Sequence, residues 1–206
     1  MSEERARKIK LLLMDVDGVM TDGTLWFFPA PAGARQETSG KAAEMASRGG
    51  YAINSPHVVE AKGFNAHDGT GISLARLGGL KTGLITKRIS DTVALRARDL
   101  RLDHVHQGIA DKLTVFREIL RDEKLSPEQA AYIGDDIIDL PVMEHCGLAI
   151  AVPNSRAEVL AAAHYVTEHA GGHGAVRDAI EFILRAQGKL DEVFDAYMRD
   201  RTPQKS

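Results

Sequence analysis

Acidic side chains cluster at two distant places in the chain, and each cluster directly follows a short apolar run. Asp15 and Asp17 follow the run at 9–14, and Asp135, Asp136 and Asp139 follow the run at 130–133. Carboxylates at positions i and i+2 of a strand share a face, and they repel each other unless a proton or a cation separates them. A hard ion with oxygen ligands, such as Mg²⁺, meets that need. The pattern therefore predicts a magnesium site with Asp135 as the best-placed ligand of the second cluster.

The same residues have simpler structural explanations. Asp17 is followed by Gly18, so the first cluster could be a solvated turn in which glycine exposes backbone N–H groups. Asp136 and Asp139 could cap a helix or favour its dipole. Capping accounts for one or two of the late carboxylates but not for all three, which leaves Asp135 for chemistry.

Two more polar side chains follow expected strands. Thr86 ends the apolar run at 81–86 and precedes Lys87 and Arg88. Its hydroxyl could bind a phosphate oxygen beside helix N-terminal amides, although helix capping by threonine is the commoner role. Lys112 stands at the start of an expected helix, where its charge opposes the helix dipole, and this favours a role such as neutralising phosphate charge.

Short apolar runs alternate with amphipathic segments, and this alternation predicts how these side chains are positioned. We expect strands at 9–14, 81–86, 103–106, 130–133 and 147–151, and helices at 69–78, 89–101, 110–123, 136–145, 155–162 and 174–187. Ser126 followed by proline is a helix-start signal. The order predicts an α/β, Rossmann-like fold with a mostly parallel sheet and helices on both faces. Ligands of such folds bind at the carboxyl ends of the strands, where the candidate residues stand.

One segment interrupts this alternation. Expected strands at 25–28 and 58–64 enclose a stretch rich in Pro, Ala, Gly and Ser, so we predict a small, flexible β-hairpin insertion around 29–57 with a helical turn at 40–48. A mobile tip, a lid and an oligomer contact all remain open. The whole chain, 1–206, is expected to form one domain with a C-terminal helical tail around 174–206.

Composition limits the partners. A net charge of −3 and a pI near 6.2 argue against a strongly cationic nucleic-acid binder. Cys146 is the single cysteine, so no intrachain disulfide can form, which fits a reducing cytoplasm. No apolar run approaches the roughly 20 residues of a membrane span. We expect a cytoplasmic protein with neither nucleic acid nor membrane as partner.

Several longer motifs resemble those of a known family. The residues D-V-D-G-V-M-T-D-G at 15–23, Thr86, Lys112 and Y-I-G-D-D-I-I-D-L-P-V-M at 132–143 resemble the haloacid dehalogenase superfamily of phosphatases. Phe64 with H-D-G-T-G-I at 67–72 and G-G-H-G-A-V-R at 171–177 narrow the resemblance to the 3-deoxy-manno-octulosonate 8-phosphate (KDO 8-phosphate) phosphatases. The chain is also similar to the phosphatase-like domain of CMP-sialate synthetases. The resemblance covers about residues 9 to 185.

The resemblance implies a mechanism. Asp15 would attack phosphorus to form an aspartyl-phosphate, and Asp17 would act as general acid and then general base. Mg²⁺ would be held by Asp15, by the backbone carbonyl of Asp17 and by Asp135, while Thr86 and Lys112 would bind the phosphoryl oxygens.

The resemblance also implies a hydrolase without a large cap domain, assembled as a homotetramer, that releases KDO and phosphate. Its implied substrate-binding residues are Arg88, Lys87, Thr21, Asp68 and Arg177, and its supporting residues are Asp136, Asp139 and Gly134.

Three departures from the family pattern bear on the sugar. Lys87 stands where glycine is usual, His173 replaces an arginine, and the hairpin tip is longer by a few tens of residues. A nonulosonate (sialate-type) 9-phosphate therefore remains an alternative substrate, and a non-catalytic oligomerisation domain an alternative function. A receiver-type signalling domain fits less well, because receivers place an acidic pair first and the phospho-acceptor on a later strand.

Overall fold

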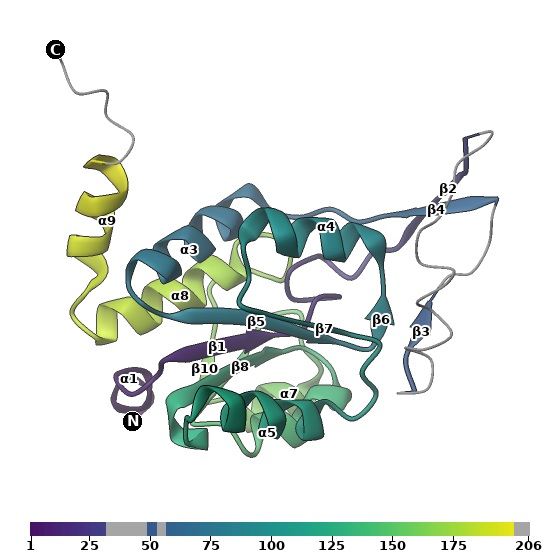
Figure 1. The fold of residues 1–206 in the computed structure, drawn as a ribbon. Coiled ribbons are helices and arrows are strands. Elements are labelled where there is room, and N and C mark those ends of the chain that lie inside the picture. The colour runs from purple at the N-terminus through teal and green to yellow at the C-terminus, as the bar shows by residue number, and fades with distance from the viewer. Residues whose placement is uncertain (32–48, 53–56, 200–206) are drawn as a thin grey trace, which may run out of the picture.

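The computed structural model describes residues 1–31, 49–52 and 57–199, and its centre is a six-stranded parallel sheet (Figure 1). The strands are β1 (Leu11–Met14), β5 (Lys81–Thr86), β7 (His104–Gln107), β8 (Ala130–Gly134), β9 (Leu148–Ala151) and β10 (Tyr165–Val166), in the order β10-β9-β8-β1-β5-β7. Strand β1 pairs with β5 on one side and β8 on the other, with Leu11 opposite both Lys81 and Ala130. The carboxyl ends of these three strands therefore lie side by side.

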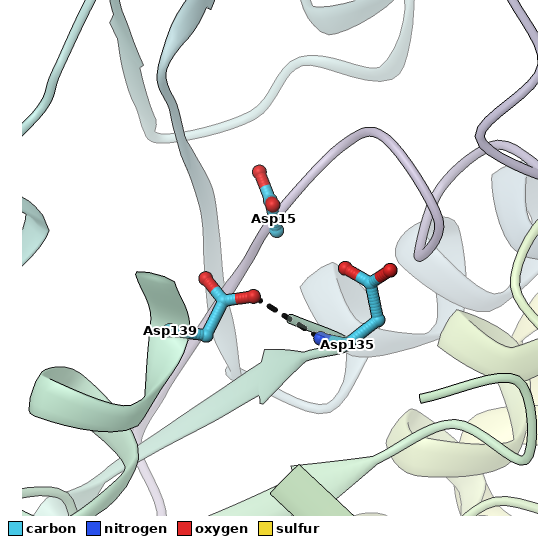
Figure 2. Close-up of side chains that lie close together, drawn as sticks. All are labelled: Asp15, Asp135 and Asp139. Carbon is cyan, nitrogen blue, oxygen red and sulfur yellow. Dashed lines mark hydrogen bonds between the residues drawn. The ribbon is translucent and has the colours of Figure 1, made fainter. Parts of the chain in front are cut away.

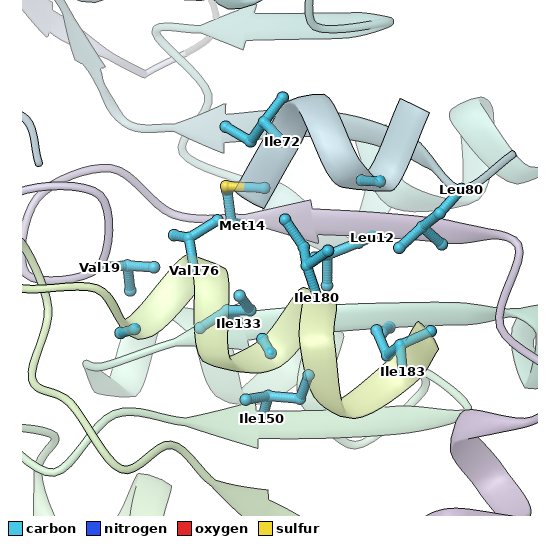
Figure 3. Close-up of a cluster of buried hydrophobic side chains, with 14 of the residues drawn as sticks. Leu12, Met14, Val19, Ile72, Leu80, Ile133, Ile150, Val176, Ile180 and Ile183 are labelled. Atoms are coloured by element: carbon cyan, nitrogen blue, oxygen red, sulfur yellow. The ribbon is translucent and has the colours of Figure 1, made fainter. Parts of the chain in front are cut away.

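Helices cover both faces of the sheet, as predicted. Helices α3 (Ala66–Leu77), α4 (Asp91–Leu100) and α8 (Ala175–Ala186) lie on one face, and α5 (Lys112–Glu123) and α7 (Ala157–Ala162) on the other (Figure 1). Strand β1 is fully buried because alternate residues enter opposite cores. Leu12 and Met14 pack with α3 and α8 in the first core (Figure 3), whereas Leu11 and Leu13 join the second core with α5.

A hairpin of β2 (Trp26–Pro29) and β4 (Val58–Ala61) projects from this body (Figure 1). A short strand, β3 (Tyr51–Ala52), pairs in parallel with β6 (Arg88–Ile89). Among the described residues, nothing larger than these short strands lies between β1 and α3, in agreement with the predicted lack of a large cap. The expected helical turn at 40–48 and the tip of the insertion lie outside the described residues.

The structure corrects several predicted boundaries. Ser126 and Gln129 do form a capping box, but the helix that it begins is only a 3-10 turn, Pro127–Gln129, because β8 follows at once. The expected helix at 136–145 is a 3-10 turn, Ile137–Asp139, followed by the short α6 (Leu140–Met143).

Five elements of the described residues were not predicted individually. They are α1 (Ser2–Ala6), the short strands β3, β6 and β10, and α9 (Leu190–Arg199). None of the described helices has the length and apolar character that crossing a membrane would require.

Candidate active site

The two acidic clusters meet at the carboxyl edge of the sheet. Asp15 is the first residue after β1 and Asp135 the first after β8, and these strands are neighbours. The backbone N–H of Asp15 donates to the carbonyl of Ile133 at 3.0 Å, which extends the pairing to the site itself. One oxygen each of Asp15, Asp135 and Asp139 lies within 4.8 Å of the others (Figure 2). Parallel pairing thus joins residues separated by more than half of the chain.

The turn after β1 depends on a glycine. Gly18 has φ of 89°, and a Cβ at this position would lie 2.1 Å from Oδ2 of Asp135. Only glycine both adopts this backbone conformation readily and lets the carboxylate approach so closely. Asn154 fixes the same turn, because its amide donates to the Gly18 carbonyl at 2.9 Å and accepts from the Gly171 N–H at 2.7 Å. Asn154 was not predicted as a site residue, because it lies in a loop whose sequence gives no local signal.

Lys112 is a buried cation between two carboxylates. Its Nζ lies 2.9 Å from Oδ2 of Asp15 and 2.7 Å from Oδ1 of Asp139, and the residue is 2% exposed. Burial alone would lower the pKa of Lys112, but the charges of Asp15 and Asp139 raise it above its usual value. Lys112 therefore keeps its charge beside the first aspartate, where a phosphate dianion would need it.

Asp139 holds this arrangement together. Oδ1 accepts from Lys112 and, at 2.8 Å, from the hydroxyl of Tyr132, whereas Oδ2 accepts from the backbone N–H groups of Asp135 at 3.1 Å and Asp136 at 3.3 Å. Both oxygens are thus engaged with donors, so Asp139 fixes the positions of Lys112, Tyr132 and the loop that carries Asp135.

The remaining carboxylates suit a divalent cation. Burial, and then the charges of Asp15 and Asp139, raise the pKa of Asp135 to about 7. Burial also raises the pKa of Asp15 to about 6, although Lys112 acts in the opposite direction. Oδ1 of Asp135 is buried and has no hydrogen-bond partner among the described residues. A hard cation would pair this oxygen and offset the repulsion between the two groups, so Asp15 and Asp135 could hold one.

The carboxylates open into a cavity of about 150 Å³. It is lined by Asp15, Asp17, Gly23, Leu25, Tyr51, Thr86, Lys87, Arg88, Asp135, Asp136 and Ile138. Oγ1 of Thr86 accepts from the Arg88 N–H at 3.4 Å, a bond that does not use the hydroxyl hydrogen. A larger hollow, bordered by Lys10 and Gln187, lies beyond the amino end of β1, away from this chemistry.

Asp17 carries two cationic partners. Nζ of Lys62 contacts Oδ1, and Nε of Arg88 donates to Oδ2 at 3.1 Å. Glu60 lies 3.8 Å from both cations, so four charges form one network. Lys62 has a fully buried side chain. Neither Lys62 nor Glu60 was predicted as a site residue, although charged residues at i and i+2 of an extended segment give a weak signal of a shared face.

Three predicted substrate-binding residues do not line this cavity. The buried hydroxyl of Thr21 donates to the carbonyl of Val16 at 3.3 Å. Asp68, in the first turn of α3, is buried against the start of α8, where it accepts from the Arg177 N–H at 3.0 Å, and burial raises its pKa to about 6. The side chain of Arg177 donates to Glu181 at 2.6 Å. Within one chain these side chains therefore hold loops and helix ends.

Comparisons with known proteins show which family the chain belongs to. Residues 85–180 match the family model of the haloacid dehalogenase-like hydrolases. A 3-deoxy-D-manno-octulosonate 8-phosphate phosphatase of Escherichia coli K12 is 38% identical over 188 residues, which cover 91% of this chain and 86% of that protein.

Solved structures give the same result. The phosphatase of that name from Yersinia pestis is 37% identical with a TM-score of 0.76, covering 92% of this chain and 88% of that one. Its counterpart from Moraxella catarrhalis, solved with magnesium, phosphate and KDO, is 32% identical with a TM-score of 0.78, covering 95% and 97%. This chain therefore belongs to the 3-deoxy-D-manno-octulosonate 8-phosphate phosphatase family of the haloacid dehalogenase-like hydrolases.

Proposed function

We propose that this protein is a magnesium-dependent phosphatase that hydrolyses KDO 8-phosphate to KDO and phosphate. The observation that carries the proposal is the meeting of Asp15, Asp135 and Lys112 at one edge of the sheet, with a buried Asp135 oxygen that no described residue hydrogen-bonds. The relatives at 38% identity and the KDO-bound neighbour support the choice of sugar.

The first half-reaction uses Asp15 as nucleophile. One carboxylate oxygen of Asp15 attacks phosphorus, the bond from phosphorus to the sugar oxygen breaks, and Asp17 donates its proton to the departing alkoxide. The ammonium of Lys112 and the hydroxyl of Thr86 bind the phosphoryl oxygens as charge moves onto them. Lys112 is already 2.9 Å from the nucleophile, so little rearrangement separates the resting and reacting geometries.

The second half-reaction restores the enzyme. Asp17 takes a proton from a water molecule that attacks the aspartyl-phosphate, and inorganic phosphate leaves with Asp15 again a free carboxylate. Mg²⁺, held by Asp15, Asp135 and the Asp17 carbonyl, would shield the nucleophile from the charge of the phosphate. Asp139, Asp136 and Gly134 shape the loop that carries Asp135.

The sugar acid would bind beside the phosphate. Arg88 and Lys87 line the cavity and carry the charge that a sugar carboxylate needs. Thr21, Asp68 and Arg177 do not line the cavity within one chain. In the proposal they belong to the substrate site only if a neighbouring subunit or a rearranged loop brings them to the sugar.

We also propose a homotetramer, in which the hairpin contributes to subunit contacts. Its support is an aromatic surface on β2: Trp26, Phe27 and Phe28 are about half exposed or more, at 56%, 49% and 50%. A cytoplasmic location belongs to the same proposal, because the buried, free thiol of Cys146 suits a reducing compartment. Light scattering of the wild type and of a Trp26→Ser, Phe28→Ser variant tests the assembly.

Steady-state assays with Mg²⁺ test the proposed activity. KDO 8-phosphate, a nonulosonate 9-phosphate and p-nitrophenyl phosphate should be compared for wild type and Asp15→Asn. We expect the highest kcat/KM for KDO 8-phosphate, and loss of activity on all three with Asp15→Asn. If no substrate is hydrolysed faster by the wild type than by Asp15→Asn, the proposal fails.

A further inference from the structure

The insertion returns to the body of the protein through a built contact. Strand β3 pairs with β6, with Tyr51 opposite Arg88, and the Tyr51 N–H donates to the Lys87 carbonyl at 3.3 Å. Two residues before Tyr51, Gly49 forms an isolated antiparallel bridge to Ile109. The return segment is therefore fixed by backbone pairing to two loops at the carboxyl edge of the sheet.

Glycine makes this contact close. A Cβ on Gly50 would lie 2.2 Å from Cα of Gly108, so no side chain fits between the two backbones. Gly49 has φ of 76°, a conformation that side chains rarely adopt. The Gly49-Gly50 pair thus has a specific use: it lets the segment lie directly on the loop after β7.

This contact places an aromatic ring at the candidate site. The centre of the Tyr51 ring is 4.7 Å from the guanidinium carbon of Arg88 and 5.8 Å from Nζ of Lys87. Tyr51 lines the same cavity as Asp15 and Asp17, and the residue is 47% exposed. The cavity therefore has reactive carboxylates at one end and an aromatic ring with two cations at its mouth.

The chemistry of this mouth suits a sugar acid. The ring face attracts cations and packs against the C–H face of a sugar, while Arg88 and Lys87 attract a carboxylate. The guanidinium of Arg88 also forms ion pairs with Asp17, at 3.1 Å from Nε to Oδ2, and with Glu60, at 3.8 Å from Nη1 to Oε2. The Tyr51 ring packs on this guanidinium and so favours its position at the cavity wall.

We propose that Tyr51, supplied by the insertion of the same chain, recognises the sugar-acid leaving group and holds Arg88 and Lys87 at the mouth of the cavity. This inference rests on the proposed phosphatase function and adds a specificity-determining residue to it. Lys87 shares this contact, because its Nζ lies 5.8 Å from the centre of the Tyr51 ring.

Kinetics of three variants test the role of Tyr51. Tyr51→Ala removes the ring, Tyr51→Leu keeps apolar bulk without a π-face, and Tyr51→Phe keeps the ring without its hydroxyl. With KDO 8-phosphate we expect Tyr51→Ala to raise KM about 5- to 30-fold, the range for losing a contact of this kind, with a much smaller change in kcat. Tyr51→Leu should resemble Tyr51→Ala, and Tyr51→Phe should resemble the wild type.

Acetyl phosphate is the matched control, because its leaving group has no sugar ring. Its kcat/KM should stay at the wild-type value in all three variants. An unchanged KM for KDO 8-phosphate in Tyr51→Ala overturns the inference, and so does an equal loss on both substrates, since that would indicate a general structural role.

Calorimetric binding of free KDO separates this inference from the proposed function. If the wild type hydrolyses acetyl phosphate but no sugar-acid phosphate, the proposed substrate is wrong. Weaker KDO binding by Tyr51→Ala than by the wild type then still supports sugar-acid recognition by Tyr51, and equal or absent binding overturns it.

Discussion

Replacing Asp139 by asparagine should destabilise this protein strongly, because both oxygens of its carboxylate accept hydrogen bonds from buried donors. Asp139 is fully buried; Oδ1 accepts from Lys112 and Tyr132, and Oδ2 accepts from two backbone N–H groups. Asparagine would put an NH₂ group on one of these two sides. In either orientation a donor then faces donors, and the charge that partly neutralises Lys112 is lost.

The expected magnitude follows from the two losses together. Removing one partner of a buried ion pair costs about 3–5 kcal/mol, and a buried donor without an acceptor costs about 1–3 kcal/mol by itself. Asp15 remains 2.9 Å from Lys112 and offsets part of the loss. We therefore expect the free energy of unfolding to fall by about 3–5 kcal/mol, or the Tm by roughly 6–20 °C for a chain of this size.

Urea unfolding followed by far-UV circular dichroism measures this change, with EDTA present so that no metal contributes. Asp136→Asn is the matched control: Asp136 is exposed and caps the Ile137 N–H, a role that asparagine fills equally well. The control should stay within about 0.5 kcal/mol of the wild type. If Asp139→Asn also stays within about 1 kcal/mol, the buried network does not stabilise the fold in the way described.

Three further outcomes follow from the site and its surroundings. Lys62→Met removes the buried cation that positions the Asp17 carboxylate. The attack of water on the aspartyl-phosphate, with Asp17 as base, is common to all substrates, so kcat should fall at least about tenfold for both KDO 8-phosphate and p-nitrophenyl phosphate; an unchanged kcat would contradict a positioning role of Lys62. The pKa of Asp68 is about 6 in the folded state and 3.8 in the unfolded state, so the native state binds the proton more tightly and loses stability as pH rises from about 4 to 6. Between pH 4 and 7.5, the free energy of unfolding of Asp68→Asn should therefore rise by on the order of 3 kcal/mol relative to that of the wild type. Urea titrations measure this difference, and a constant difference across the pH range would refute the burial argument. Added Mg²⁺ at 100 times its Kd should stabilise the wild type by about 2.7 kcal/mol in thermal unfolding; Asp135→Asn should abolish that shift, and a full shift in the variant would place the ion elsewhere.

The local sequence pattern was sufficient to predict the strands that position the candidate catalytic residues. The apolar runs before Asp15 and Asp135 predicted buried strands, and the amphipathic segments between the runs predicted a parallel arrangement; both predictions are confirmed. Since parallel strands end at one edge, the meeting of Asp15, Asp135, Thr86 and Lys112 followed from connectivity. The short β10 was not predicted, and the capped turn at Ser126 was expected to begin a helix, because two or three residues hold too little periodic signal. Pairing with neighbouring strands decides the state of such short segments.

Only the tertiary structure decided how the site is completed. Lys62 reaches Asp17 across 45 residues, Asn154 reaches Gly18 across 136, and Tyr51 packs on Arg88, all through contacts that leave no periodic trace in the sequence. In the folded chain, Thr21 and Asp68 form hydrogen bonds with backbone groups of their own chain and do not line the cavity. The sequence determined which residue types follow which strands, because that depends on local hydrophobic order. The partner of each charged group depended on which loops fold over the sheet edge, and that is a property of the packed chain alone.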